Sequence, residues 1–74
     1  GVDTVALQRR LVRHFSLGEL EELALGLRLE GEEIWSDAAT RQARARELVK
    51  FMERRGRLEE LVALCRELRK SVRW

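Results

Sequence analysis

The sequence contains no proline and no tyrosine, and it has a single cysteine, Cys65, and a single histidine, His14. Without proline, long helices run uninterrupted. One cysteine excludes an internal disulfide and makes a reducing compartment the default, so we expect a cytoplasmic protein. One cysteine and one histidine are too few for the usual zinc sites. We therefore expect no metal and no other cofactor.

The sequence also lacks the patterns that carry catalysis. It has no glycine-rich phosphate loop, and no serine or cysteine with a base at a recognisable spacing. The acidic pairs Glu21-Glu22, Glu32-Glu33 and Glu59-Glu60 are adjacent, so their side chains diverge on a helix and do not form an acid/base couple. No apolar run approaches the roughly 20 residues of a membrane span, and no signal-peptide pattern opens the chain. We expect that the protein is not an enzyme.

What the sequence does contain is typical of helices. Charged residues make up 38% of the 74 residues, and the hydrophobic 45% includes only 5% aromatics, with leucine, valine and alanine dominating. This composition predicts an all-α fold. Because the chain is short and shows no internal boundary, we expect one domain over residues 1–74, excised from a longer protein if Gly1 is a cloning remnant.

Apolar residues recur at helical spacing in four segments. The predicted helices are Asp3–Phe15, Leu17–Leu27, Ala38–Arg55 and Leu58–Val72, with a short turn at Glu32–Trp35. The connections are short, so the sequence predicts a small antiparallel bundle of five to six helices.

Several residues predict where these helices begin and end. Either Asp3 or Thr4 caps the first helix, and Ser16 with Glu19 forms a capping box for the second. Ser36 or Asp37 is expected to cap the third helix. Gly56 suits the left-handed position that closes it.

The apolar stripes also predict the core. Ile34 and Trp35 are expected to fill space between the helices, Leu17 to lie on a buried face, and Cys65 to be a small buried hydrophobe. Gly26 marks either a close helix approach or early fraying, and Trp74 either folds back or marks a truncation point. The predicted core residues are Leu11, Phe15, Leu20, Leu23, Leu48, Val49, Met52, Leu61, Val62 and Leu68.

Charge is segregated along the chain. Residues 16–34 carry six glutamates against the single arginine Arg28, whereas the segments on either side are basic. Such complementary patches favour heterologous contacts between protein copies, which stack head to tail when the rotation does not close. Leu25 is expected to be exposed between acids and to anchor a partner. The candidate interaction residues are Arg9, Arg13, Glu19, Glu21, Glu22, Leu25, Arg46, Arg54 and Arg55.

Nucleic-acid binding is the alternative, because the sequence pI is about 9.3. The third predicted helix has cations along its length, but Glu47 and Glu53 interrupt them. The acidic second helix would also face the phosphates. The alternative function is therefore a basic helical module that binds nucleic acid or regulates another protein.

Two motifs resemble a known family. The run His14–Leu23, HFSLGELEEL, and the pair ARELV at Ala45–Val49 and RRGRLEEL at Arg54–Leu61 resemble the bacterial effector-associated domains of the death-like group. The second motif is also similar, more weakly, to animal death effector domains. The similarity extends from about Leu7 to Leu68. The family often has a glycine after its second helix, whereas here the next glycine is Gly31.

This resemblance implies a death-like helical fold that serves as a homotypic adaptor. Such domains recruit an effector with a matching domain, such as a protease or NTPase, in prokaryotic conflict and immune signalling. The implied partner is a protein, either a matching domain or a second copy that forms an oligomer or filament, and not a membrane.

Overall fold

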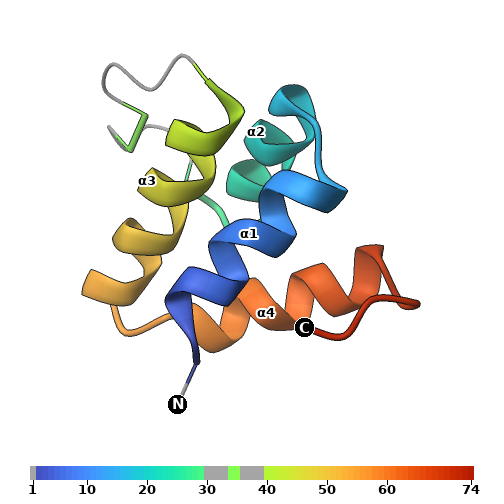
Figure 1. Cartoon of the computed structure of the whole chain (residues 1–74). Helices are drawn as coiled ribbons and strands as arrows, with labels where there is room; N and C mark the ends of the chain where they lie inside the picture. The colour runs from blue at the N-terminus through green and yellow to red at the C-terminus, as the bar shows by residue number, and fades with distance from the viewer. Residues whose placement is uncertain (1, 30–33, 36–39) are drawn as a thin grey trace.

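Four helices make up most of the computed structural model, which describes residues 2–29, 34–35 and 40–74. No strand occurs among those residues, so the predicted all-α class is confirmed (Figure 1). Of the predicted short turn at Glu32–Trp35, only Ile34 and Trp35 are described, and they are not helical; the predicted caps Ser36 and Asp37 lie outside the described residues. The helices are α1 (Thr4–His14), α2 (Leu17–Gly26), α3 (Arg41–Arg54) and α4 (Leu58–Leu68).

Side-chain caps begin three of the helices. The Asp3 carboxylate accepts from the Ala6 amide at 3.1 Å, which settles the choice between Asp3 and Thr4. At α2 the predicted capping box is present, with the Glu19 amide donating to the Ser16 hydroxyl. Thr40 caps α3 by accepting from the Ala43 amide at 3.1 Å. Each cap satisfies an amide that the first helical turn leaves without a backbone partner.

The α3–α4 turn closes on Gly56 as the sequence predicts. Gly56 has a φ of 67°, and its amide donates to the Glu53 carbonyl at 3.1 Å. The Arg57 amide donates to the Met52 carbonyl at 2.8 Å. This pair of bonds is a Schellman motif, whose left-handed residue is normally glycine because glycine has no Cβ.

A second Schellman motif ends α2, but its left-handed residue is an arginine. Arg28 has a φ of 61°, and its amide donates to the Leu25 carbonyl at 3.0 Å. The Leu29 amide donates to the Ala24 carbonyl at 2.9 Å. The sequence predicts no turn at Arg28, since the first glycine after α2 is Gly31. The motif therefore forms against the steric preference of a residue with a Cβ.

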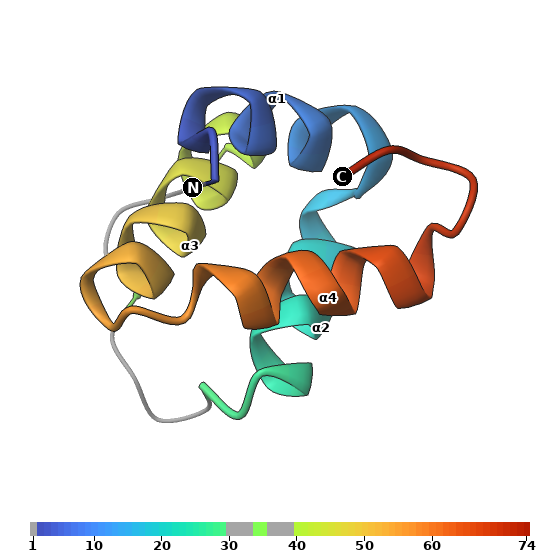
Figure 2. The same cartoon turned by 90° about the horizontal axis from the view of Figure 1, so that it is seen from below.

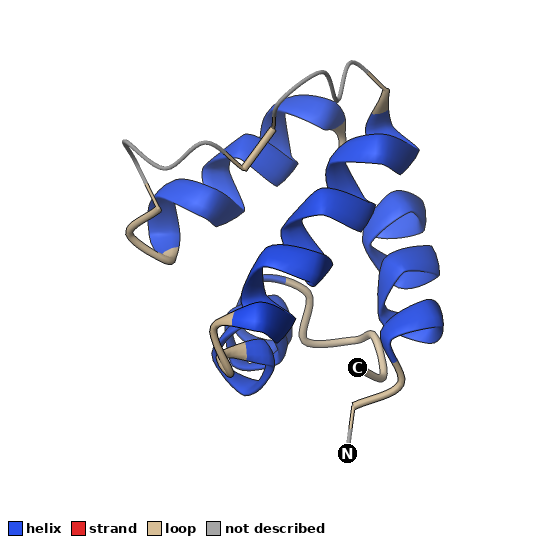
Figure 3. Ribbon diagram, turned by 90° about the vertical axis from the view of Figure 1, so that its left-hand side faces the viewer, coloured by secondary structure: helices blue, strands red, loops and turns tan. Residues whose placement is uncertain are grey.

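Helix α3 is the common packing partner of the other three helices. It packs against α1, α2 and α4, and five of its side chains are buried. In Figures 1 and 3, α1 and α3 lie side by side and run in opposite directions, whereas α4 crosses the lower end of α3. The sequence predicts that successive helices are antiparallel, and this prediction is wrong for α3 and α4. The buried side chains of α3 are Ala45, Leu48, Val49, Phe51 and Met52.

Nine of the ten predicted core residues are buried, and Leu68 is the exception, with half of its surface exposed. Helix α4 ends at Leu68 rather than at Val72, because the backbone leaves the helical conformation at Arg69 (φ −134°, ψ 73°). The last turn therefore has no further helix to cover it. Leu17 was also expected to be buried, yet it is 37% exposed because it starts α2 at the edge of the packed face.

Gly26 marks a close approach of α2 to α4, one of the two predicted roles. A Cβ built on this residue would lie 3.1 Å from Cδ2 of Leu64, closer than an ordinary van der Waals contact. Ile34 is buried and Trp35 packs against the core, so both fill space as expected.

Replacement of Leu61 by alanine should reveal how much the core contributes. Leu61 is fully buried, so Leu61→Ala should lower the free energy of unfolding by about 2–5 kcal/mol, through lost apolar burial and the cavity left behind. Leu68→Ala is the matched control on the same helix and should cost less than about 1 kcal/mol. Urea denaturation measures both, and equal losses would contradict the assignment of Leu61 to the core.

Replacement of Arg28 by glycine should stabilise the domain. The left-handed backbone costs a non-glycine residue about 1–2 kcal/mol. The greater freedom of glycine in the unfolded chain offsets about 0.5–1 kcal/mol of this. We expect a net gain of about 0.5–1 kcal/mol for Arg28→Gly in urea denaturation. Arg66→Gly, at an exposed residue of α4, is the control and should lower the free energy of unfolding by about 1 kcal/mol. A loss at both sites would show that Arg28 is not strained.

Candidate functional site

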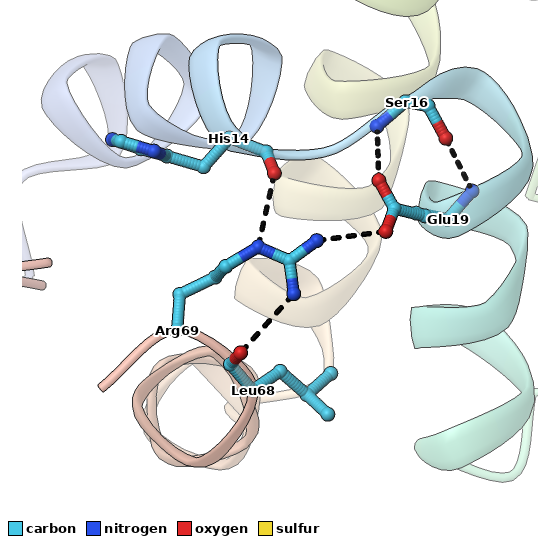
Figure 4. A network of polar contacts seen from close by, with 5 residues as sticks. All are labelled: His14, Ser16, Glu19, Leu68 and Arg69. Carbon is cyan, nitrogen blue, oxygen red and sulfur yellow. Dashed lines mark hydrogen bonds and ion pairs between the residues drawn. The ribbon is translucent and has the colours of Figure 1, made fainter. Parts of the chain in front are cut away.

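Arg69 joins the C-terminal end of α4 to the junction between α1 and α2. As Figure 4 shows, its Nε donates to the His14 carbonyl at 3.2 Å and its Nη2 to Oε2 of Glu19 at 2.7 Å. Its Nη1 donates to the carbonyl of Leu68. The guanidinium also lies 4.4 Å from the centre of the Phe15 ring, within cation–π range. One side chain therefore fixes the relative positions of three helices.

The chain after Arg69 folds back onto α1, so the predicted folding back of Trp74 is confirmed (Figure 2). The Trp74 indole donates to the Arg69 carbonyl at 3.2 Å, and its ring centre lies 5.8 Å from those of His14 and Phe15. Arg10 donates to the Trp74 carbonyl at 3.5 Å. The tail thus extends the Arg69 contacts along α1.

Glu19 is held at the α1–α2 junction by two elements. The Ser16 amide donates to Oε1 of Glu19 at 2.9 Å, and Arg69 binds its Oε2. Both bonds lower the pKa of the Glu19 carboxyl below its ordinary 4.5, and the bond from the Ser16 amide has the larger effect. Because the folded-state pKa is the lower one, ionised Glu19 stabilises the fold above pH 4.5. That contribution is lost as the pH falls through the folded-state pKa.

The other predicted interaction residues of α2 differ in how far they are engaged. Glu21 forms an ion pair with Arg44 of α3. No ion pair of Glu22 is found within the described part of the chain. Leu25 is 59% exposed, as predicted. Glu22 and Leu25 are therefore the α2 residues most open to a partner.

The predicted basic residues lie on two helices. Arg9 and Arg13 are exposed on α1, and Arg46 and Arg54 are exposed on α3. Arg55, the residue that ends α3, lies with its guanidinium 4.7 Å from the centre of the Phe51 ring. The candidate cations thus lie on two helices that pack against each other.

Arg57 makes a second link that the sequence analysis did not identify. Its Nη2 donates to the Leu27 carbonyl at 3.1 Å, and its Nε and Nη2 pair with Glu60. The hydrogen bonds with Glu60 raise the pKa of Arg57 and lower that of Glu60. Arg57 thereby ties the start of α4 to the end of α2.

Arg44, Arg57 and Arg69 are thus structural residues that sequence reasoning missed. Along the sequence, Arg44 lies 23 residues from Glu21, Arg57 lies 30 residues from Leu27, and Arg69 lies 50 residues from Glu19. No local spacing signals such pairs. The capping box was the one available clue, because it holds the Glu19 carboxylate in a fixed orientation at the junction.

Cys65 is buried in the core, as predicted, and burial raises the pKa of its thiol to about 12. The thiol is thus protonated at neutral pH and lacks the thiolate that a nucleophile or metal ligand needs. Among the described residues, no group of three or more His, Cys, Asp or Glu side chains is arranged to hold a metal ion. None of the helices in those residues has the length and apolar character needed to cross a bilayer.

The outward faces of α1 and α2 lie on opposite sides of the molecule. In Figure 2, α1 lies at the top of the view and α2 at the bottom, and α3 lies to the left of α2. The exposed arginines of α1 and the exposed acids of α2 therefore lie on helices at opposite sides of that view. This arrangement can bind two partners at once but offers no single cleft between the charged faces.

The motifs at His14–Leu23, Ala45–Val49 and Arg54–Leu61 pointed to the bacterial effector-associated domains. The family model for effector-associated domain 7 matches residues 7–70, so the chain belongs to that family. No curated protein and no solved structure matches the chain.

Replacement of Arg69 should show what its contacts contribute. Arg69→Met keeps much of the side-chain volume but removes the bond to His14 and the contact with Phe15, so unfolding should become easier by about 1–3 kcal/mol. Arg66→Met, one turn earlier and exposed, should change stability by less than about 0.5 kcal/mol. Urea denaturation at neutral pH compares them. Equal effects of the two substitutions would contradict the linking role of Arg69.

Proposed function

We propose that this chain is an adaptor domain with a death-like fold, which recruits an effector by binding a matching domain. The observation that carries the proposal is the match of the effector-associated domain 7 family to residues 7–70. The effector would be a protease or an NTPase in prokaryotic conflict or immune signalling in the cytoplasm. The chain itself would supply binding and no catalysis, and it would need no cofactor.

The exposed residues of α2 support a role in binding protein. Leu25 is a large apolar side chain exposed next to the acidic pair Glu21-Glu22. An apolar anchor surrounded by polar groups that exclude water is a common arrangement at interface hot spots. The acids also select partners, because a basic surface is attracted and an acidic one is repelled. We propose Leu25 and Glu22 as contact residues on this helix.

The basic residues define the remaining part of the proposed interface. Arg9, Arg13, Arg46 and Arg54 are exposed, and each exposed ion pair contributes only about 0–1 kcal/mol. Several of them must therefore act together to hold a partner. Glu19, Glu21 and Arg55 are proposed to contribute less charge to the interface, since their side chains already make contacts within the domain.

Nucleic-acid binding receives less support from the same contacts. Of the cations on α3, Arg44 pairs with Glu21, one of the carboxylates of the neighbouring α2. A phosphate backbone approaching α3 would meet those carboxylates, and their repulsion would oppose the attraction of the arginines.

Affinity capture with the natural full-length protein tests the proposal. At low salt, we expect capture of a protein in which a second effector-associated domain is joined to a protease or NTPase. Leu25→Asp should reduce the capture at least tenfold with an unchanged melting temperature, because the side chain is exposed. Leu68→Asp, at a comparably exposed leucine on α4, should not reduce it.

One outcome would contradict the adaptor role, and another would contradict only the role of Leu25. Capture of nucleic acid without any matching domain would favour the alternative function. Equal capture by the parent protein and Leu25→Asp would exclude Leu25 as an anchor. The adaptor role would then depend on whether the captured protein carries a matching domain.

A further inference from the structure

Two outward helix faces carry similar patterns with opposite charge. The α1 ridge consists of the exposed residues Val5, Arg9 and Arg13, and the α2 ridge consists of the exposed residues Gly18, Glu21, Glu22 and Leu25. Val5 and Leu25 are the two most exposed large apolar residues in the described part of the chain, at 56% and 59%. One lies among arginines and the other among glutamates.

The spacing along the two ridges matches when the helices run in opposite directions. Arg9 lies four residues after Val5, and Glu22 lies three residues before Leu25. At about 1.5 Å per residue these separations are about 6 Å and 4.5 Å. When Val5 of one copy faces Leu25 of another, Arg9 therefore comes opposite Glu22. Arg13 then lies beside Gly18, where a Cβ would meet nothing within 4 Å and the surface is open.

The contacts inside the domain select these residues from the wider set of charges. Glu19 binds Arg69, and Glu21 pairs with Arg44, so both carboxylates are partly neutralised. No ion pair of Glu22, Arg9 or Arg13 is found among the residues that the structure describes. Charge that is not neutralised within the domain acts most strongly on a partner, which makes Arg9 and Glu22 the matched pair.

The two ridges belong to opposite sides of one molecule, so a single copy cannot join them (Figure 3). A contact between unlike surfaces leaves one ridge of each copy open. Further copies therefore add in the same way and produce a ring or an open filament.

We propose that the α1 ridge of one copy docks antiparallel on the α2 ridge of a second copy of this chain, with Val5 against Leu25 and Arg9 against Glu22. The proposal rests on the proposed function and specifies that the matching domain is the chain itself. A single helix pair covers much less than the roughly 1,200 Å² of a stable complex. Association is therefore weak at each contact, and it is driven by apolar burial with selection by charge.

Charge reversal on each ridge tests this contact. We expect sedimentation velocity at 0.05 M salt and submillimolar protein to show association of the parent chain, weakening as salt rises past about 0.15 M. Arg9→Glu alone and Glu22→Arg alone should each weaken association about tenfold, because like charges then face each other. The two variants mixed together should associate again, since each unlike pair is restored between copies. The doubly substituted chain should also associate with itself.

Arg66→Glu is the matched control, because it changes the net charge equally at an exposed residue of α4 that lies on neither ridge. It should leave association within about twofold of the parent. A loss with Arg66→Glu as large as with Arg9→Glu, or no rescue in the mixture, would overturn the proposed pairing.

Failure of this contact is distinguishable from failure of the adaptor role. A chain that remains monomeric up to submillimolar concentration at low salt overturns self-docking. The capture of a different protein with a matching domain would still support the proposed function. Melting temperatures of all variants, expected to remain near that of the parent, show that the reversals act on association and not on folding.

Discussion

Burial of apolar surface against α3 is the constraint on which the rest of this structure depends. Helices of 10 to 14 residues are marginal in water on their own, so each needs a partner for its apolar face. Helix α3 provides that partner for the other three helices. Because the shared core takes one face of every helix, the charged residues must lie outward. No polar or charged residue among those described is buried.

The same packing explains why the charged faces are separate. Helices α1 and α2 both pack against α3, and Figure 3 shows α1 on the right and α2 on the left. The acids of α2 nearest to α3 and α4 are then drawn into pairs with Arg44 and Arg69. What remains for a partner is the outermost part of each ridge. The proposed interaction surface is therefore a consequence of the fold. Its main proposed contact residues are Leu25 with Glu22 on α2 and Val5 with Arg9 on α1.

Much of this architecture is predictable from the sequence, because helix periodicity, caps and glycine turns are local. The capping box at Ser16 and Glu19 and the left-handed Gly56 are examples, and they give the helix boundaries at both turns. The end of α4 was not predictable, since the apolar pattern continues to Val72 while Arg69 leaves the helix to reach His14 and Glu19. Arg28 was missed for another reason: a left-handed turn without glycine carries no sequence signal. For the candidate site, Leu25 was predictable from helix phase, but the internal partners of Glu19 and Glu21 were not.

Disulfide trapping measures the central claim, that the ridges of two copies meet, most directly. Cys65 is buried with a thiol pKa of about 12, so it does not compete with an introduced cysteine. A Val5→Cys copy and a Leu25→Cys copy, mixed with copper–phenanthroline as oxidant, should form a cross-linked pair, because a disulfide requires Cβ atoms about 3.5–4.5 Å apart. A Val5→Cys copy mixed with a Leu68→Cys copy should not. Equal cross-linking of the two mixtures, or none in the first, would contradict the contact.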